Sequence, residues 1–291
     1  LNVAVDSVDR NKKYVPFDYQ LNLEDLWFKY GIRIEPNLIL DLECSQIPLQ
    51  TGTIGSKPQF DLFPYYYHPI ISPKSKHPIA KSLSRVDMRF PSTIDTNVRT
   101  KTDVKKTVLL TSSQYTRIQY PPVTLDFEIL RYPPKPEKFN KAPQPVAVLY
   151  EGVFPSLYAN RVQESMKVGL EELGLEFKAE SSPTRMLVVS DGDVIRNVVS
   201  RDGEVSPTGF NQFEQRVYAN KDFLINAVEY LLDEKGVIEA RGKEVKLRLL
   251  DTIRATEERG FWQLLNIVLP LVFLAIFGIA YTALRRRRYA K

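Results

Sequence analysis

The longest apolar segment of the chain runs from Phe261 to Leu284 and contains no charged side chain. Glu257, Glu258 and Arg259 precede this segment, and four consecutive arginines follow it. A helix needs about 20 apolar residues to cross the hydrocarbon core of a bilayer. Core helices of soluble proteins seldom carry so long an uncharged run. The pattern therefore predicts a transmembrane helix over residues 261–284, with 251–260 as a juxtamembrane segment.

The arginine cluster predicts the orientation of this helix. Basic residues beside a spanning helix tend to stay in the cytoplasm, so residues 285–291 are expected to form a basic cytoplasmic tail. Residues 1–260 are then expected on the periplasmic side of a Gram-negative inner membrane. The residues expected to determine this topology are Arg285, Arg286, Arg287 and Arg288.

Two polar residues, Gln263 and Asn266, interrupt the first turns of the apolar segment. An interhelical hydrogen bond in a membrane is favourable by about 1 kcal/mol, so both are candidate contacts to a partner helix. Asn266 lies deeper and is the stronger candidate. For Gln263, solvation at the membrane interface is an equally good explanation.

Three segments before the anchor carry apolar side chains at the spacing of one helix face. The first begins after Asn22, which is expected to cap it. The second runs from Asn160 to Leu173 and is expected to end at Gly174. The third covers Lys221 to Leu232, with Asn220 as its expected cap. The expected inward-facing residues are Leu23, Leu26, Trp27 and Tyr30, then Val162, Met166, Leu170 and Leu173, then Phe223, Ala227, Tyr230 and Leu231.

Extended segments alternate with these helices. Residues 32–43, Val146 to Tyr150 and Arg185 to Ser190 are rich in branched apolar residues, which is typical of strands. Strand followed by helix, repeated, predicts an α/β sheet with helical cover. Residues 85–130 contain strand-like runs with little helix, which predicts mixed or antiparallel additions. The soluble domain is expected to span 1–250, with two lobes as an alternative, joined near the proline-rich segment 132–145.

The formal charge of +5 resides in the tail, because Arg285 to Arg288 and Lys291 alone carry five positive charges. The rest of the chain is neutral, and nucleic-acid affinity depends on clustered lysine and arginine. We therefore expect no nucleic-acid partner. Cys44 is the only cysteine, so neither an internal disulfide nor a CxxC metal or redox site is expected.

Few residues are candidates for catalysis. Cys44 lies in DLECSQIP without the glycine-lined turn of an activated nucleophile, and His68 and His77 precede prolines in expected surface loops. The GxSxG, HExxH, GxGxxG and GxxxxGK[ST] patterns do not occur in the sequence. The prediction is a protein that is not an enzyme, with no cofactor or metal, and with any ATP hydrolysis supplied by a partner.

Two further motifs each have two explanations. Asp191 and Asp193 follow an apolar strand, where carboxylates of α/β folds hold ligands such as a hard cation. The more common explanation is that these aspartates cap the next helix and shape the turn. Likewise, the run from Tyr65 to Tyr67 could line a peptide or glycan surface, but it is more typical of a strand with one packed face.

Several long segments resemble one family in the same order: NLEDLWFKYGIRIEPNLILDLEC, KTVLLTSSQYTR, MLVVSDGDVIRN, the run from Phe210 to Asp251, and FWQLLNIVLP. They are similar to the gliding-motility-associated ABC transporter auxiliary proteins of Bacteroidetes, the GldG family. The resemblance implies a non-catalytic subunit beside an ABC permease and its separate ATPase, with periplasmic motility or secretion proteins as further partners.

The resemblance also implies a Rossmann-like or flavodoxin-like fold, similar to intraflagellar-transport-like and class I glutamine-amidotransferase-like domains. Members of the family have a transmembrane helix and more of the α/β domain upstream. Residues 1–20 contain no apolar stretch of a signal peptide and the chain does not begin with Met. The domain is therefore expected to be incomplete at its N-terminus.

Two functions of different class follow. The first is an interaction subunit of an ABC-type complex, and the second is a periplasmic receptor domain for a small solute or glycan. A receptor should contain one deep pocket with convergent polar groups, whereas an assembly subunit should present an extended apolar or aromatic surface.

Overall fold

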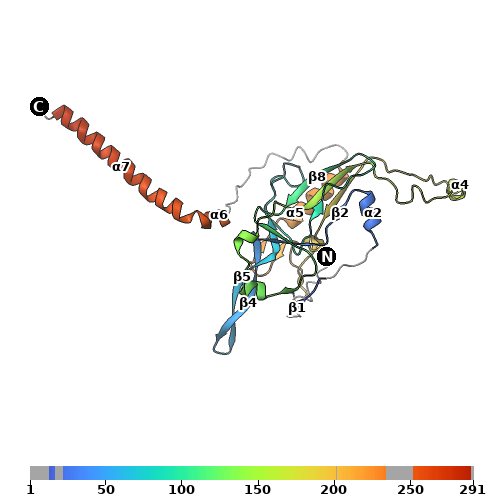
Figure 1. Ribbon diagram of the computed structural model, residues 1–291, viewed down its shortest axis with the longest axis horizontal. Helices are drawn as coiled ribbons and strands as arrows, with labels where there is room; N and C mark the ends of the chain where they lie inside the picture. The colour runs from blue at the N-terminus through green and yellow to red at the C-terminus, as the bar shows by residue number, and fades with distance from the viewer. Residues whose placement is uncertain (1–12, 17–21, 201, 234–251, 290–291) are drawn as a thin grey trace. The chain divides into compact units, whose positions relative to one another are not determined.

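The computed structural model describes residues 13–16, 22–200, 202–233 and 252–289 (Figure 1). These residues fall in two units, Leu1–Lys246 and Leu247–Lys291. The first unit combines several small sheets with short helices. The second contains a long apolar helix. The chain therefore has a mixed α/β fold and one candidate apolar C-terminal anchor.

A three-stranded antiparallel sheet forms the main core of the first unit, in the order β12 (Thr184–Val189), β11 (Pro145–Gly152) and β8 (Val104–Thr111). Residues 146–150 of β11 are fully buried, which confirms the predicted buried strand. Helix α5 (Asn220–Leu232) packs on this core through Phe223 and Ala227, as predicted. Arg185 of β12 donates from Nη1 to the carbonyls of Tyr230 and Asp233, at 2.8 and 2.9 Å, and so fixes the end of α5.

A long hairpin, β4 (Cys44–Ile54) and β5 (Lys57–Ile71), forms the second part of the unit (Figure 1). Its base packs in an aromatic cluster, where Tyr65 and Tyr67 are buried and Tyr66 is half-buried. This alternation along β5 confirms a strand with one packed face. The buried residues of this cluster are Leu38, Leu40, Ile47, Tyr65, Tyr67, Phe90, Leu125, Leu130 and Phe139.

Short elements complete the unit. The paired strands are β3 (Leu38–Asp41) with β9 (Thr116–Gln119), β1 (Lys13–Tyr14) with β10 (Leu125–Asp126), β2 (Arg33–Ile34) with β7 (Ile94–Asp95), β13 (Phe210–Asn211) with β14 (Arg216–Val217), and β6 (Val86–Asp87) with the end of β5. The helices are α2 (Glu24–Lys29), α3 (Glu128–Arg131), α4 (Glu164–Glu172), and the 3₁₀ turns η1 (Pro136–Lys138) and η2 (Gly192–Ile195).

Every strand pair among the described residues is antiparallel. The expected Rossmann-like or flavodoxin-like arrangement, which requires parallel strands, is therefore not found in this part of the chain. The physical reason lies between β11 and β12. A parallel pair needs a connection that crosses back over the sheet, but here the connection leads out to α4, none of whose residues is buried, and returns beside itself. The predicted antiparallel strands in residues 85–130 are confirmed.

The predicted helix caps were wrong in detail. Asn22 has φ 53° and lies before the cap position of α2, which Leu23 occupies without a capping side chain. Asn220 is the first residue of α5, and its buried side chain instead bonds the backbone of Asp87 and Val194. Tertiary hydrogen bonds thus replaced the local cap. The expected helix over 160–173 begins at Glu164.

The second unit consists of α6 (Thr252–Glu257) and α7 (Arg259–Tyr289). A stretch of 30 residues, Arg259–Arg288, is long and apolar enough to cross a membrane, and none of its most apolar window is buried. Just before it, the carboxylate of Glu258 accepts from Arg254 Nε at 2.8 Å and from Trp262 Nε1 at 2.9 Å. Gln263 and Asn266 are exposed on α7.

Candidate functional site

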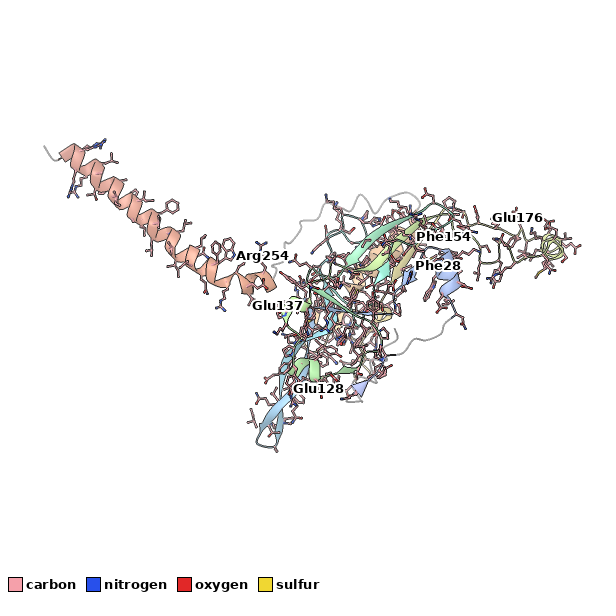
Figure 2. All side chains as sticks on the ribbon, viewed as in Figure 1. Phe28, Glu128, Glu137, Phe154, Glu176 and Arg254 are labelled. Carbon is pink, nitrogen blue, oxygen red and sulfur yellow. The ribbon has the colours of Figure 1, made fainter. Side chains whose placement is uncertain are left out.

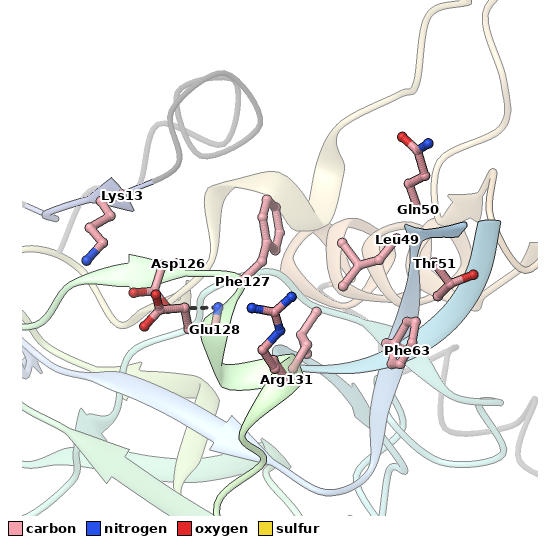
Figure 3. A pocket seen from close by; sticks show the side chains of 10 residues that line it. Lys13, Leu49, Gln50, Thr51, Phe63, Asp126, Phe127, Glu128 and Arg131 are labelled. Carbon is pink, nitrogen blue, oxygen red and sulfur yellow. Dashed lines mark hydrogen bonds between the residues drawn. The ribbon is translucent and has the colours of Figure 1, made fainter. Parts of the chain in front are cut away.

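An open groove of about 690 Å³ lies between the β4–β5 hairpin and α3 (Figure 3). Its size falls within the range of ligand-binding pockets, although it opens to solvent. Lys13 of β1 and Asp126 of β10, which are strand partners, both line it. The lining residues are Lys13, Leu49, Gln50, Thr51, Phe63, Asp126, Phe127, Glu128, Leu130 and Arg131.

The floor of the groove is apolar. Ile47 pairs with Phe63 across the hairpin, so Phe63 lies on the same face as Leu49, two residues further along β4. Leu130 of α3 is 9% exposed and belongs to the aromatic cluster. The ring of Phe127 lies 6.1 Å from that of Tyr65, which anchors it to the packed base of the hairpin. The floor is therefore a continuation of the core that the described residues leave uncovered.

The rim of the groove is charged. Arg131 and Lys13 supply cations, and no ion pair joins either of them to a carboxylate within the part of the chain described here. Asp126 Oδ1 accepts from the backbone N–H of Glu128 at 3.1 Å, which starts the short helix α3. An apolar floor with a mixed rim of free charges is suited to a protein segment with apolar and polar side chains.

A second open groove, of about 640 Å³, lies on the other side of α3. Tyr67 Oη donates to Gln119 Oε1 at 2.6 Å at its base, and burial raises the pKa of Tyr67 to about 12. Three cations line this groove, namely Arg117, Lys135 and Lys138. Because Asp126 and Glu128 line both grooves, the α3 segment separates two neighbouring surfaces.

Asp191 is a structural cap in this fold. Its Oδ1 accepts from the N–H of Asp193 at 2.7 Å, and its Oδ2 accepts from the N–H of Arg89 at 2.7 Å. Asp193 lies 3.7 Å from Arg196 Nη1. The described residues contain no group of three side chains suited to a metal. These contacts agree with the explanation that both aspartates shape the turn.

The environments of the three candidate catalytic groups oppose catalysis, although Cys44 of β4 pairs with Pro69 of β5, the residue after His68. Burial raises the pKa of the Cys44 thiol, and the carboxylates of Asp41 and Glu214 raise it further, which opposes formation of a nucleophilic thiolate. The expected surface position of His68 was wrong. It lies in β5 with its ring 4.7 Å from Tyr65 and 4.9 Å from Phe90. The pairing of β5 with β4 shifts register between Pro64 and Pro69, so the regular alternation of faces is interrupted there.

The histidine environments oppose a role as general base. Burial lowers the pKa of His68 to about 3, so the ring is neutral at pH 7 and its basicity is low. His77 Nδ1 accepts from the N–H of Ile79 at 3.3 Å, and its ring meets Tyr230 edge-on at 4.6 Å. Neither histidine lines the groove.

The groove itself was missed in the sequence. Residues 85–130 were predicted to contain strand-like runs with little helix, but EILR forms α3, and Phe127 and Leu130 line the hollow. The sequence does contain a local signal for a helix start. Asp126 precedes Glu128 by two residues, and the residues between them and directly after Glu128 are apolar. The other side of the groove is formed by β4, which is distant from α3 in the sequence and carries no such signal.

Comparison with protein families decides the class of this molecule. Residues 1–227 match the family model ABC_transp_aux, described as an ABC-type uncharacterized transport system. The chain belongs to the ABC_transp_aux family. A comparison with curated proteins finds no match, and a comparison with solved structures finds none either.

Membership in ABC_transp_aux gives the coarse function. The chain is an auxiliary component of an ABC-type transport system and associates with the transporter complex. Membership in this auxiliary family suggests a non-catalytic role. The apolar helix α7 is compatible with a membrane anchor in such a system.

Proposed function

We propose that this chain is a non-catalytic subunit of an ABC-type transporter, anchored in the inner membrane by α7 and acting through protein contacts. The observation that carries the proposal is that one chain of this auxiliary family combines a candidate spanning helix with a first unit that contains an open groove with an apolar floor. Such a groove offers a protein segment both apolar contact and free charges.

The proposal places the soluble unit in the periplasm and the tail in the cytoplasm. Arg285 to Arg288 support this orientation because they outnumber the single Arg259 that follows Glu257 and Glu258 at the other end of the helix. The partners are then the ABC permease in the membrane and its separate ATPase in the cytoplasm.

The proposed process is gliding motility and the secretion associated with it. The support is the resemblance of the long segments quoted above to the gliding-motility auxiliary proteins of Bacteroidetes. Periplasmic motility or secretion proteins are the further partners. Within the anchor, Gln263 and Asn266 are the proposed contacts to a permease helix, because both are exposed polar groups on α7.

A receptor for a small solute or glycan has less support. The described part of the chain contains two large hollows near α3, and both are open grooves rather than one deep pocket. In addition, large apolar side chains are exposed on the hairpin, including Ile54 and Phe60. An extended apolar surface is typical of an assembly subunit.

Groove variants test the proposal. The full-length chain with an affinity tag is purified from membranes in mild detergent, and bound permease is quantified by mass spectrometry. Leu49→Arg and Arg131→Glu are expected to reduce bound permease by about tenfold, a loss typical of central contacts. Lys74→Glu, a charge reversal at an exposed loop residue outside the groove, is the matched control. Equal recovery of permease with all three folded variants would reject the groove as the contact.

A further inference from the structure

The second groove beside α3 gathers basic side chains from separate parts of the chain. Arg117 lies on β9, Lys135 directly precedes the turn η1, and Lys138 is the last residue of η1. Figure 2 labels Glu128 on α3 and Glu137 on η1, two elements that contribute residues to the lining of this groove. The fold therefore brings together cations that are distant in the sequence.

Local backbone geometry places these side chains on common sides of their elements. Arg117 and Gln119 are two residues apart on β9, so they lie on one face of the strand. In η1, Lys138 N donates to Lys135 O at 3.0 Å, and side chains three residues apart align in a 3₁₀ turn. Phe139 directly follows η1 and is buried in the aromatic cluster. The turn is therefore held against the core, while its two lysines remain exposed.

The base of the second groove offers hydrogen-bond donors. Burial raises the pKa of Tyr67 to about 12, although the positive charge of Arg117 opposes this rise. The phenol is therefore protonated at pH 7 and donates to Gln119 Oε1 at 2.6 Å. This bond occupies the acceptor of the Gln119 amide and leaves its Nε2 donor available, since no acceptor for it is found among the described residues. Such donors suit a carboxylate.

The charges around α3 are unbalanced. The two grooves are lined by five basic and two acidic residues, namely Lys13, Arg117, Arg131, Lys135 and Lys138, and Asp126 and Glu128. None of the five cations has an ion pair within the described residues. The chain outside its basic tail is neutral, so this excess is local. A local excess of unpaired cations favours a partner of negative charge.

The apolar floor of the first groove restricts the kind of partner. Leu49 and Phe63 lie on one side of that groove, and Asp126 and Glu128 lie on the other (Figure 3). These two carboxylates also line the second groove, so only the α3 segment separates the apolar floor from the cations. A polyanionic glycan would match the cations alone. A protein segment with apolar and acidic side chains matches both grooves.

We propose that the two grooves bind one segment of a partner protein, with apolar side chains in the first groove and aspartate or glutamate side chains in the second. The partner belongs to the transporter complex, so this inference rests on the proposed function. Asp126 and Glu128 lie between the two grooves and repel the acidic side chains of the segment. Removal of the exposed charge of Glu128 should therefore strengthen binding.

The test uses the full-length protein in detergent and three synthetic peptides. Each peptide carries a block of leucine and phenylalanine, joined by Gly-Ser to a block of glutamates, lysines or glutamines. Fluorescence anisotropy is expected to give the tightest binding for the glutamate peptide, and added salt should reduce its advantage. Lys135→Glu/Lys138→Glu is expected to weaken binding of this peptide about tenfold.

Lys74→Glu/Lys76→Glu is the matched control. It makes the same change of charge at two exposed lysines that line neither groove, and it should leave binding unchanged. Leu49→Gln alters the apolar floor without a change of charge and is expected to weaken the glutamate peptide about fivefold. Glu128→Gln is expected to strengthen it about twofold. Circular dichroism checks the fold of each variant.

The proposal is overturned if the three peptides bind equally or none binds, or if Lys74→Glu/Lys76→Glu weakens binding as much as Lys135→Glu/Lys138→Glu. Two other results would assign the grooves to another occupant and also overturn it. One is tight binding of heparin, an anionic polysaccharide, together with unchanged peptide binding by Leu49→Gln. The other is self-association of the full-length protein, measured by sedimentation, that Lys135→Glu/Lys138→Glu abolishes.

Failure of the proposed function has a different signature. In that case no ABC subunit copurifies with the unaltered chain, whatever the peptides do. If the permease does copurify but the peptides show no preference for glutamate, the inference about the acidic segment fails by itself.

Discussion

Two buried aspartates make the stability of the first unit depend on pH. Asp87 and Asp191 are each 6% exposed, and burial raises the pKa of each to about 7. In the unfolded chain an aspartate has a pKa of about 3.9. At pH values between these two pKa values, Asp87 and Asp191 keep their protons in the folded protein, whereas the same side chains in the unfolded chain have lost them. The free energy of unfolding therefore falls as pH rises from about 4 to about 7, and this contribution is constant at higher pH.

Asp87→Asn is predicted to reduce this pH dependence. Its Oδ1 has no hydrogen-bond partner, and Oδ2 lies 4.0 Å from Arg89 Nε, so a neutral amide removes a poorly compensated charge. The slope lost is at most about 1.4 kcal/mol per pH unit. Urea unfolding between pH 5 and pH 8 measures it. An unaltered slope in the variant would mean that Asp87 does not titrate in this window.

Cys44→Ala is predicted to fold and to retain binding of the transporter and motility. Burial and the nearby carboxylates of Asp41 and Glu214 raise the pKa of the thiol, so it lacks the activation that a nucleophile requires. Circular dichroism checks the fold, and copurification with a motility assay checks function. A folded Cys44→Ala protein that reaches the membrane without function would reveal an active site at this residue.

At the scale of elements, Asn220 joins α5 to two other segments. Its amide donates to the carbonyls of Asp87 and Val194, and it accepts from the N–H of Asp87. Asn220→Ala leaves these buried groups without partners and is predicted to lower the free energy of unfolding by about 2–3 kcal/mol. Asn226→Ala, which removes one bond of 3.3 Å to Ile79 O, is the control and should cost about 1 kcal/mol or less. Similar losses for both would refute the role of Asn220.

Asn266→Leu is predicted to weaken binding of the permease while leaving insertion and the soluble unit intact. The exposed amide lies on α7, where a hydrogen bond to another helix is worth about 1 kcal/mol. Bound permease after membrane purification is the readout, with Gln263→Leu compared beside it. If Asn266→Leu leaves the complex intact, and exchange of the whole segment 261–284 for an unrelated helix does so too, recruitment depends on the first unit.

Local patterns predicted several elements and missed others for physical reasons. The continuous apolar run in β11 and the helical spacing of Phe223 and Ala227 in α5 were sufficient, because both segments pack on the main core. The spacing in α4 also predicted a helix, but it carried no information on whether this chain covers its apolar face. The groove unites β4 with α3, so only the fold brings Leu49 to Leu130.

At the scale of the whole molecule, strand direction was the largest difference. The order of strand and helix along the chain is the same for a crossover connection and for an arm that returns on itself. The outcome depends on whether the helix packs on the sheet, and α4 does not. Composition predicted the long apolar helix more directly, because the length and apolarity of α7 are properties of one continuous segment.

The topology of the chain is predicted from the charges at the two ends of α7. A fusion of alkaline phosphatase after Lys291 in the full-length protein should be inactive, because Arg285 to Arg288 are predicted to keep this end in the cytoplasm. A green fluorescent protein fusion at the same place should fluoresce and serves as the positive control. Active phosphatase at this position would reverse the orientation and place the soluble unit in the cytoplasm.

The central claim is that this chain is a membrane-anchored subunit of an ABC-type transporter. The most direct measurement is isolation of the tagged full-length protein from native membranes in mild detergent, with identification and quantification of the proteins that remain bound after gel filtration. The account predicts an ABC permease and a separate ATPase in constant ratio to the chain across the peak. Recovery of the chain from membranes without either subunit, or its presence in the soluble fraction, would contradict the account.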